Sequence, residues 1–150
     1  MYEVENILIS VEDRHVLNML NGVKTVELRR RPLRVPVGSR VWIYSKVPRG
    51  EVSAHGVIEH IENAPPAKLW ARYGAKSGIK RAEFFDYFEG IGNGCAIVFK
   101  EIHGLHATIS LEHVRKTISS FHPPQFFKFL KQGSPELELF LLANPTFQLR

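Results

Sequence analysis

The most informative part of the sequence is GVKTVELRRR, residues 22–31. The apolar side chains of Val26 and Leu28 fall on one face of an extended chain, and charged side chains such as Glu27 fall on the other. This alternation predicts a β-strand over about residues 24–30 with one apolar and one charged face. A strand of this kind borders a core on one side and is free to bind a partner on the other.

Hydrophobic periodicity predicts further elements on both sides of this strand. Strands are expected at residues 7–9, 40–46, 51–61 and 95–102, and a strand followed by a loop at 105–118. Helices are expected from just after Ser10, the first residue of a stretch that resembles a capping box, to about residue 21, and at about residues 65–73, 81–89, 123–131 and 135–143. Gly56, inside the long strand, indicates a bulge or a corner of a barrel. Strands and helices mixed in this way indicate an α+β fold.

The charge of the chain is concentrated in one segment. The whole chain has a net charge of +5. Residues 24–50 hold eight basic residues against one acidic residue, Glu27, so this segment carries 8 − 1 = +7 and the rest carries −2. The basic residues are Lys24, Arg29, Arg30, Arg31, Arg34, Arg40, Lys46 and Arg49. A localised excess of this kind predicts an anionic partner.

The composition excludes several classes of protein. With Cys95 as its single cysteine, the chain has no internal disulfide and lacks the cysteine pairs of the usual structural zinc sites. No cofactor-binding fingerprint is present, so neither a metal nor a cofactor is expected. The first residues, 1–5, lack the pattern of a secretory leader, and no apolar run is long enough to span a membrane. We therefore expect a cytoplasmic protein.

Four residues of the 22–31 stretch carry a family resemblance. Gly22, Lys24, Glu27 and Arg29 match the motif Gly-x-Lys-x-x-Glu-x-Arg. With this motif the chain resembles the ASCH domain family (activating signal cointegrator homology), a branch of the PUA-like superfamily.

The context of the motif supports the resemblance. Residues 43–48, Ile-Tyr-Ser-Lys-Val-Pro, are similar to the tyrosine-containing strand end of the family. At 150 residues the chain has the length of a single domain. We expect one ASCH domain over residues 1–150, with its core at about 5–102 and a C-terminal helical extension at about 103–150.

The resemblance implies both a fold and a class of partner. The fold would be a PUA-like mixed β-barrel of about five to six strands with flanking α-helices. Members of the family bind RNA, and some of them cleave single-stranded RNA. The main prediction is therefore an RNA-binding domain that holds single-stranded RNA, or a nucleotide-like small ligand, in a basic cleft.

The resemblance also assigns residues to that cleft. Lys24, Glu27 and Arg29 would line it, and Tyr44, Ser45 and Lys46 would form the opposite lip. Aromatic stacking by the tyrosine and phosphate contacts by the cations would bind a single strand. The complete predicted nucleic-acid-binding set is Lys24, Arg29, Arg30, Arg31, Tyr44, Ser45, Lys46 and Arg49.

Other functions remain open at this point. The first alternative is a metal-independent ribonuclease that uses Lys24, Glu27 and Tyr44 for proton transfer and charge stabilisation. An acetylcytidine amidohydrolase fits less well, because that branch of the family has a threonine where this chain has Glu27. A regulatory module that binds DNA is a further alternative. The 24–30 segment could also be an ordinary solvated edge strand.

Overall fold

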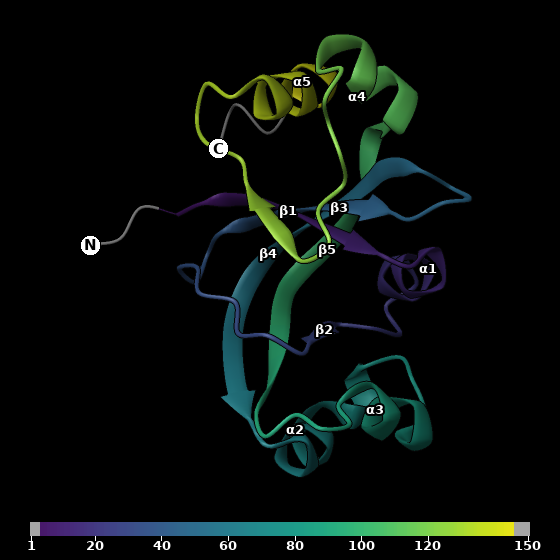
Figure 1. The fold of residues 1–150 in the computed structure, drawn as a ribbon, viewed down its shortest axis with the longest axis vertical. Coiled ribbons are helices and arrows are strands. Elements are labelled where there is room, and N and C mark those ends of the chain that lie inside the picture. Colours follow the sequence, from purple (N-terminus) through teal and green to yellow (C-terminus); the bar gives the residue numbers. More distant parts are fainter. Residues whose placement is uncertain (1–3, 146–150) are drawn as a thin grey trace.

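The computed structural model describes residues 4–145. The expected absence of a secretory leader rests on residues 1–5. The first three of these lie outside the described residues. Six strands form one sheet in the order β2-β5-β4-β3-β1-β6 (Figure 1). The strands are β1 (Asn6–Val11), β2 (Val26–Arg29), β3 (Arg40–Ser45), β4 (Glu51–Ala64), β5 (Gly94–Ser110) and β6 (Phe127–Phe129).

The sheet is mixed, because β1 and β3 are parallel while the other neighbouring strands are antiparallel. Helices cover its two ends and one side. They are α1 (Asp13–Leu20), α2 (Pro66–Tyr73), the 3₁₀ helix η1 (Gly74–Lys76), α3 (Arg81–Tyr87), α4 (Leu111–Thr117) and α5 (Pro135–Ala143). The prediction of an α+β, PUA-like mixed barrel with flanking helices is confirmed as a curled half-barrel.

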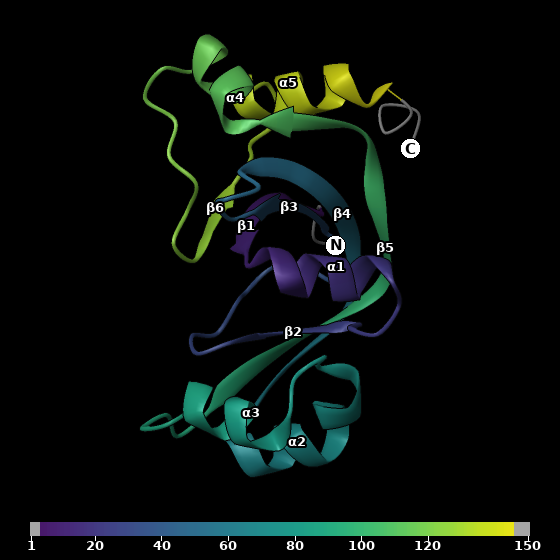
Figure 2. The same cartoon turned by 90° about the vertical axis from the view of Figure 1, so that its right-hand side faces the viewer.

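The curl comes from the two longest strands, β4 and β5. Figure 2 shows β5 bending as it passes from the end near α2 and α3 to the end near α4 and α5. The register between β4 and β5 shifts next to Ile58, as expected where bulges bend a strand pair. At Gly56 a Cβ atom would lie 2.8 Å from the ring of Phe99, so only glycine allows this close approach.

Three apolar clusters fill the spaces around the sheet. The first lies inside the curl, where Val16 and Met19 of α1 pack against alternate residues of β1 and β3. The second joins Trp42 of β3 to α4 and α5, with the rings of Trp42 and Phe140 5.4 Å apart. The third packs α2 and α3 beneath β2 and β5 and contains Phe84. The sheet thus separates the helices at one end from those at the other.

Two sequence-based expectations in the C-terminal part are wrong. No helix forms at residues 123–131, because Phe127–Phe129 pairs with the otherwise open edge of β1 as β6. The expected strand and loop at 105–118 is a strand only as far as Ser110. There the Ser110 hydroxyl accepts a hydrogen bond from the His113 backbone and begins α4 instead.

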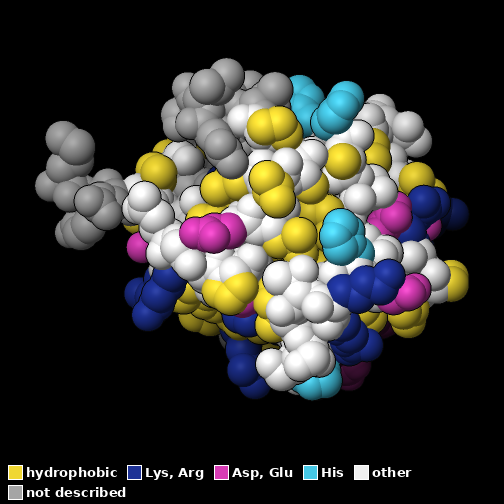
Figure 3. All heavy atoms as spheres, turned by 90° about the horizontal axis from the view of Figure 1, so that it is seen from above, with side chains coloured by type: hydrophobic (Ala, Val, Ile, Leu, Met, Phe, Trp, Pro, Cys, Tyr) yellow, Lys and Arg dark blue, Asp and Glu magenta, His cyan; other side chains and the backbone are white. Residues whose placement is uncertain are grey.

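The upper face of the molecule keeps some apolar surface. Figure 3 shows hydrophobic side chains gathered on the face above α4 and α5. Leu142 of α5 is 75% exposed there. None of the helices within residues 4–145 combines the length and the apolar character that crossing a membrane requires.

Candidate functional site

The site begins with a buried lysine at the entry to β2. The chain turns at Gly22, which has a φ of 79°, and then carries Lys24 inward so that its side chain is only 2% exposed. The ammonium group donates a hydrogen bond to the backbone carbonyl of Ser77 at 2.7 Å. Gly78 packs on the lysine, because a Cβ atom there would lie 3.1 Å from the Cβ of Lys24. The turn between η1 and α3 therefore holds Lys24 in place.

Lys24, Glu27 and Arg29 form one ionic network, which we call the buried triad. Glu27 lies between the two cations, with Oε1 3.4 Å from Nζ of Lys24 and Oε2 2.8 Å from Nη2 of Arg29. Arg29 also donates to the backbone carbonyl of Ser10 in β1 at 2.9 Å. The network thus connects the edge strand β2 to the inside of the curl.

Burial and charge act in opposite directions on the pKa values of Glu27 and Lys24. Burial raises the pKa of Glu27, but the charges of Arg29 and Lys24 together hold it below its ordinary value. Burial lowers the pKa of Lys24, and Glu27 offsets only part of that effect. Glu27 therefore stays ionised, which makes it a weak proton acceptor and a good anchor for the two cations.

A pocket of about 140 Å³ opens beside the triad. A cavity of about this size holds a single aromatic ring. Its walls come from β1, α1, β2 and the segment around α3. The lining residues are Ser10, Val11, Glu12, Arg14, His15, Lys24, Glu27, Leu28, Arg29, Lys46, Ile79, Glu83 and Tyr87.

Two pocket residues have a buried polar atom without a hydrogen-bond partner among residues 4–145. One is Arg29, through its Nε atom, and the other is His15. It lies in the first turn of α1, and its Nδ1 atom is buried without a hydrogen-bond partner among residues 4–145. Burial lowers the pKa of His15, and the nearby charge of Lys24 lowers it further. The imidazole is therefore neutral at neutral pH and can accept a proton or a hydrogen bond.

Other charged side chains form the rim of the pocket. Arg14 is paired with Glu83 of α3 and, at 2.9 Å, with Glu12. These hydrogen bonds raise the pKa of Arg14 and lower that of Glu83. Lys46, just after β3, is exposed and forms no ion pair with any described residue. It is the rim cation that is available to an incoming anion.

Four of the sequence-predicted site residues meet at the pocket, namely Lys24, Glu27, Arg29 and Lys46. Tyr44 and Ser45 do not line it. Tyr44 is 3% exposed and packs with Trp42 on the face of the sheet that α4 and α5 cover. The Ser45 hydroxyl lies 2.5 Å from that of Ser53. Of the three residues expected to form the opposite lip of the cleft, only Lys46 lines the pocket.

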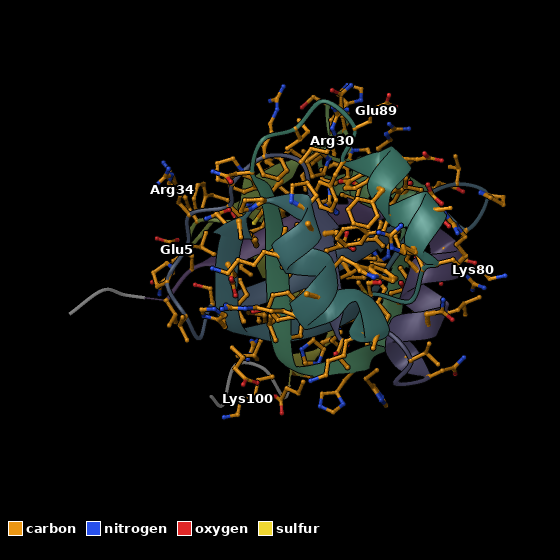
Figure 4. All side chains as sticks on the ribbon, turned by 90° about the horizontal axis from the view of Figure 1, so that it is seen from below. Glu5, Arg30, Arg34, Lys80, Glu89 and Lys100 are labelled. Atoms are coloured by element: carbon orange, nitrogen blue, oxygen red, sulfur yellow. The ribbon has the colours of Figure 1, made fainter. Side chains whose placement is uncertain are left out.

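The remaining predicted cations lie outside the pocket. Arg30 donates to the backbone carbonyl of Glu89, beside which Figure 4 shows it. Arg49 pairs with Asp13 at 2.8 Å and with Glu51 at 3.6 Å. Arg31 is exposed and is not among the lining residues.

Sequence reasoning missed His15 and Tyr87. Tyr87, in α3, supplies the aromatic wall that had been expected from Tyr44, and its hydroxyl donates to the backbone carbonyl of Leu28 at 3.1 Å. Neither residue stands in a recognisable motif. Their only signal in the sequence is a place on a short helix, and packing alone brings those helices to β2.

The curled mixed sheet with a buried ionic network on its edge strand defines a small α+β domain of the PUA-like type. A protein from Zymomonas mobilis named "ASCH domain-containing ribonuclease" is 30% identical over 125 residues, which are 83% of this chain and 84% of that protein. The chain belongs to the ASCH domain family. No model of a protein family matches it.

Solved structures agree with this assignment. The crystal structure of ASCH from Zymomonas mobilis has a TM-score of 0.84 at 27% identity, covering 93% of this chain and 94% of that chain. A serine-to-alanine variant of the same protein has a TM-score of 0.85 at 26% identity, covering 95% and 99%. A protein from Agrobacterium tumefaciens, at 11% identity and a TM-score of 0.53, covers 93% of each chain and shares the fold alone.

Proposed function

We propose that this protein binds single-stranded RNA and seats one unit of the strand in the pocket beside the buried triad. The observation that carries the proposal is a ring-sized pocket with cations on its walls. Such a pocket accepts a base or a phosphoryl group from a single strand but excludes a duplex, whose bases are stacked and paired. The ribonuclease name of the Zymomonas mobilis relative supports RNA as the ligand class.

The parts of the pocket have complementary roles in this proposal. Lys46 and Arg29 would contact phosphate, and the ring of Tyr87 would pack against a base or a ribose. Base–aromatic contacts contribute about 1–3 kcal/mol each. A free nucleotide fits the same chemistry and would compete with RNA for the pocket.

Binding is tested with a labelled single-stranded RNA and the purified full chain. Lys46→Gln should weaken binding about 3- to 5-fold and flatten the salt dependence of log K by about 0.7, the loss of one phosphate contact. Lys131→Gln, the same change at an exposed lysine between β6 and α5, serves as the control and should bind as the wild type does. If the wild type does not retain RNA even at low salt, the proposal is wrong.

RNA cleavage is a second candidate function, favoured by the unpartnered Nδ1 of His15. In this reaction a ribose 2′-hydroxyl attacks the adjacent phosphorus, the bond to the 5′-oxygen breaks, and a 2′,3′-cyclic phosphate forms. His15 would take the 2′-hydroxyl proton, and a water molecule from solvent would give a proton to the departing 5′-oxygen. Lys24 and Arg29 would stabilise the charge on the phosphorane.

Cleavage is tested with the same RNA. His15→Gln should lower kcat/KM about 100- to 10,000-fold while RNA is still retained. His106→Gln, an exposed histidine of β5, is the matched control and should leave the rate unchanged. Because His15 acts when neutral, the rate should rise with pH through a pKa below 6.5. Equal rates for the His15 variant and the wild type would remove His15 from the reaction.

For location, we propose the cytoplasm. A single free cysteine, Cys95, buried in the core, is typical of a chain that works in a reducing compartment. A fluorescent fusion of the full chain should therefore give a diffuse cytoplasmic signal.

A further inference from the structure

A second hollow adjoins the pocket. Ile79 lines both the pocket and a hollow of about 620 Å³ whose other walls include Val23, Trp70 and Lys80. The hollow runs over η1 and the turn that holds Lys24. A chain leaving the pocket past Ile79 would enter this hollow directly.

The segment that builds the hollow is basic. Residues 66–81 contain five Lys and Arg and no Asp or Glu. One of the five, Arg72, is bound to Glu62 at 2.7 Å. Lys76 and Lys80 are exposed and form no ion pair with any residue in the described range 4–145, so their charges are available to an anion.

The floor of the hollow is apolar. Trp70 is half-buried there and packs edge-on against Phe84, with 5.0 Å between ring centroids. Val23 is 56% exposed although it is apolar. Apolar floors flanked by cations are typical of grooves that bind single-stranded nucleic acid without reading its sequence.

We call this hollow, together with Lys76 and Lys80 beside it, the basic groove. The basic groove has a limit on its far side. Through Val23 and Ala75 it reaches a third hollow of about 410 Å³, which contains Lys76 but also Glu59. The carboxylate disfavours a phosphate beyond Lys76. Seen from below, α2 and α3 face the viewer and Lys80 lies at the edge beside α1, whereas Lys100 lies on the opposite side (Figure 4).

We infer that the RNA strand continues from the pocket past Ile79 and lies along this hollow as far as the edge of the third hollow. Its phosphates would lie at Lys80, which lines the first of these hollows, and at Lys76, which lines the other. The inference rests on the proposed function and deepens it, because it makes the ligand an oligonucleotide that extends beyond the unit in the pocket. A mononucleotide would occupy the pocket alone and would not reach these lysines.

The inference is tested with the full chain, an eight-nucleotide single-stranded RNA and a mononucleotide. Lys76→Gln combined with Lys80→Gln should weaken binding of the oligonucleotide about 10-fold and flatten its salt dependence by about 1.4, or two phosphate contacts. Binding of the mononucleotide should not change. The matched control combines Lys100→Gln with Lys131→Gln, two exposed lysines outside the groove, and should bind both ligands as the wild type does.

The possible failures are distinguishable. If the wild type binds neither ligand, the proposed function fails and the inference fails with it. If the wild type binds the oligonucleotide but the Lys76 and Lys80 double variant binds it equally well with the same salt slope, only the inference is overturned. An equal loss in the Lys100 and Lys131 control would also overturn it, because the effect would then reflect total charge.

Discussion

Glu27 determines the chemistry of the site by holding two cations in a place where water is largely excluded. It is 6% exposed and is in contact with Lys24 and Arg29 at once. A buried ion pair gives little net stability, but the loss of one partner leaves an uncompensated buried charge. Glu27 therefore acts by positioning the cations, and the pocket depends on it without using it as a base.

We expect Glu27→Gln to lower the free energy of unfolding by about 3–5 kcal/mol, because Lys24 and Arg29 then lose their counter-ion. The measurement is urea unfolding at neutral pH. Glu59→Gln, an exposed carboxylate of β4, is the matched control and should change stability by no more than about 0.5 kcal/mol. If Glu27→Gln is as stable as Glu59→Gln, Glu27 does not hold Lys24 and Arg29 in place.

The same residue predicts a pH dependence. The pKa of Glu27 is lower in the folded protein than its ordinary 4.5, so its contribution to stability is complete above pH 4.5 and is lost as the pH falls through the folded value. The wild type should therefore lose more stability on acidification below pH 4.5 than Glu27→Gln loses. Glu12 and Glu83, whose pKa values are also lowered, are present in both proteins and cancel in the difference. If the free energies of unfolding of the wild type and Glu27→Gln fall in parallel below pH 4.5, this prediction is wrong.

At the scale of elements, the turn between η1 and α3 does as much for the site as β2 does. It supplies the Ser77 carbonyl that accepts from Lys24, and Gly78, which packs on the lysine stem. Gly78 has a φ of 76°, in the region that favours glycine. The turn is thus built around one buried side chain that comes from another part of the chain.

Gly78→Ala should therefore damage the site more than an ordinary glycine replacement would. Gly90→Ala is the matched control, because Gly90 has a φ of 78° but no atom within 4 Å of a Cβ placed there. Both changes should cost about 1–2 kcal/mol from backbone strain. Only Gly78→Ala should also displace Lys24 and reduce RNA affinity. Thermal unfolding and RNA titration check the two effects, and equal RNA affinities would refute the difference.

At the scale of the whole molecule, the sheet divides the protein into a binding side and a supporting side. The pocket and the basic groove lie near α1, α2 and α3, whereas α4 and α5 pack on the far face around Trp42. Figure 1 shows α2 and α3 at one end of the molecule and α4 and α5 at the other. The C-terminal segment is part of this frame, because β6 pairs with β1.

We expect Phe140→Ala, in the centre of the far face, to lower the free energy of unfolding by about 3–5 kcal/mol. RNA affinity should be unchanged at temperatures where the variant is folded, because the pocket lies across the sheet. Leu142→Ala, at a site that is 75% exposed in the same helix, should change stability by no more than about 0.5 kcal/mol. Urea unfolding and RNA titration measure these effects, and a loss of affinity in folded Phe140→Ala would contradict the division into two sides.

The local features of this protein follow from its amino-acid sequence. Strand alternation, the Gly-x-Lys-x-x-Glu-x-Arg motif with its family resemblance, and the uneven charge were enough to predict an α+β ASCH domain and four of the pocket residues, Lys24, Glu27, Arg29 and Lys46. These predictions succeed because side-chain direction along one strand depends only on its neighbours. The same local signals could not show that residues 127–129 add to a sheet edge, which depends on a strand more than 100 positions away.

Which charges converge depends on the packing of segments that lie far apart in the sequence. Alternation along β3 sends Tyr44 to the α5 face. The strand ends at Ser45, and the turn that follows, whose first backbone amide donates to Val11 of β1, leaves Lys46 on the pocket side. Lys24 finds its carbonyl partner 53 residues further along the chain. Convergence over such separations depends on how helices pack against a bent sheet. No pattern within a few residues encodes that packing, and for this reason His15 and Tyr87 emerged only from the fold.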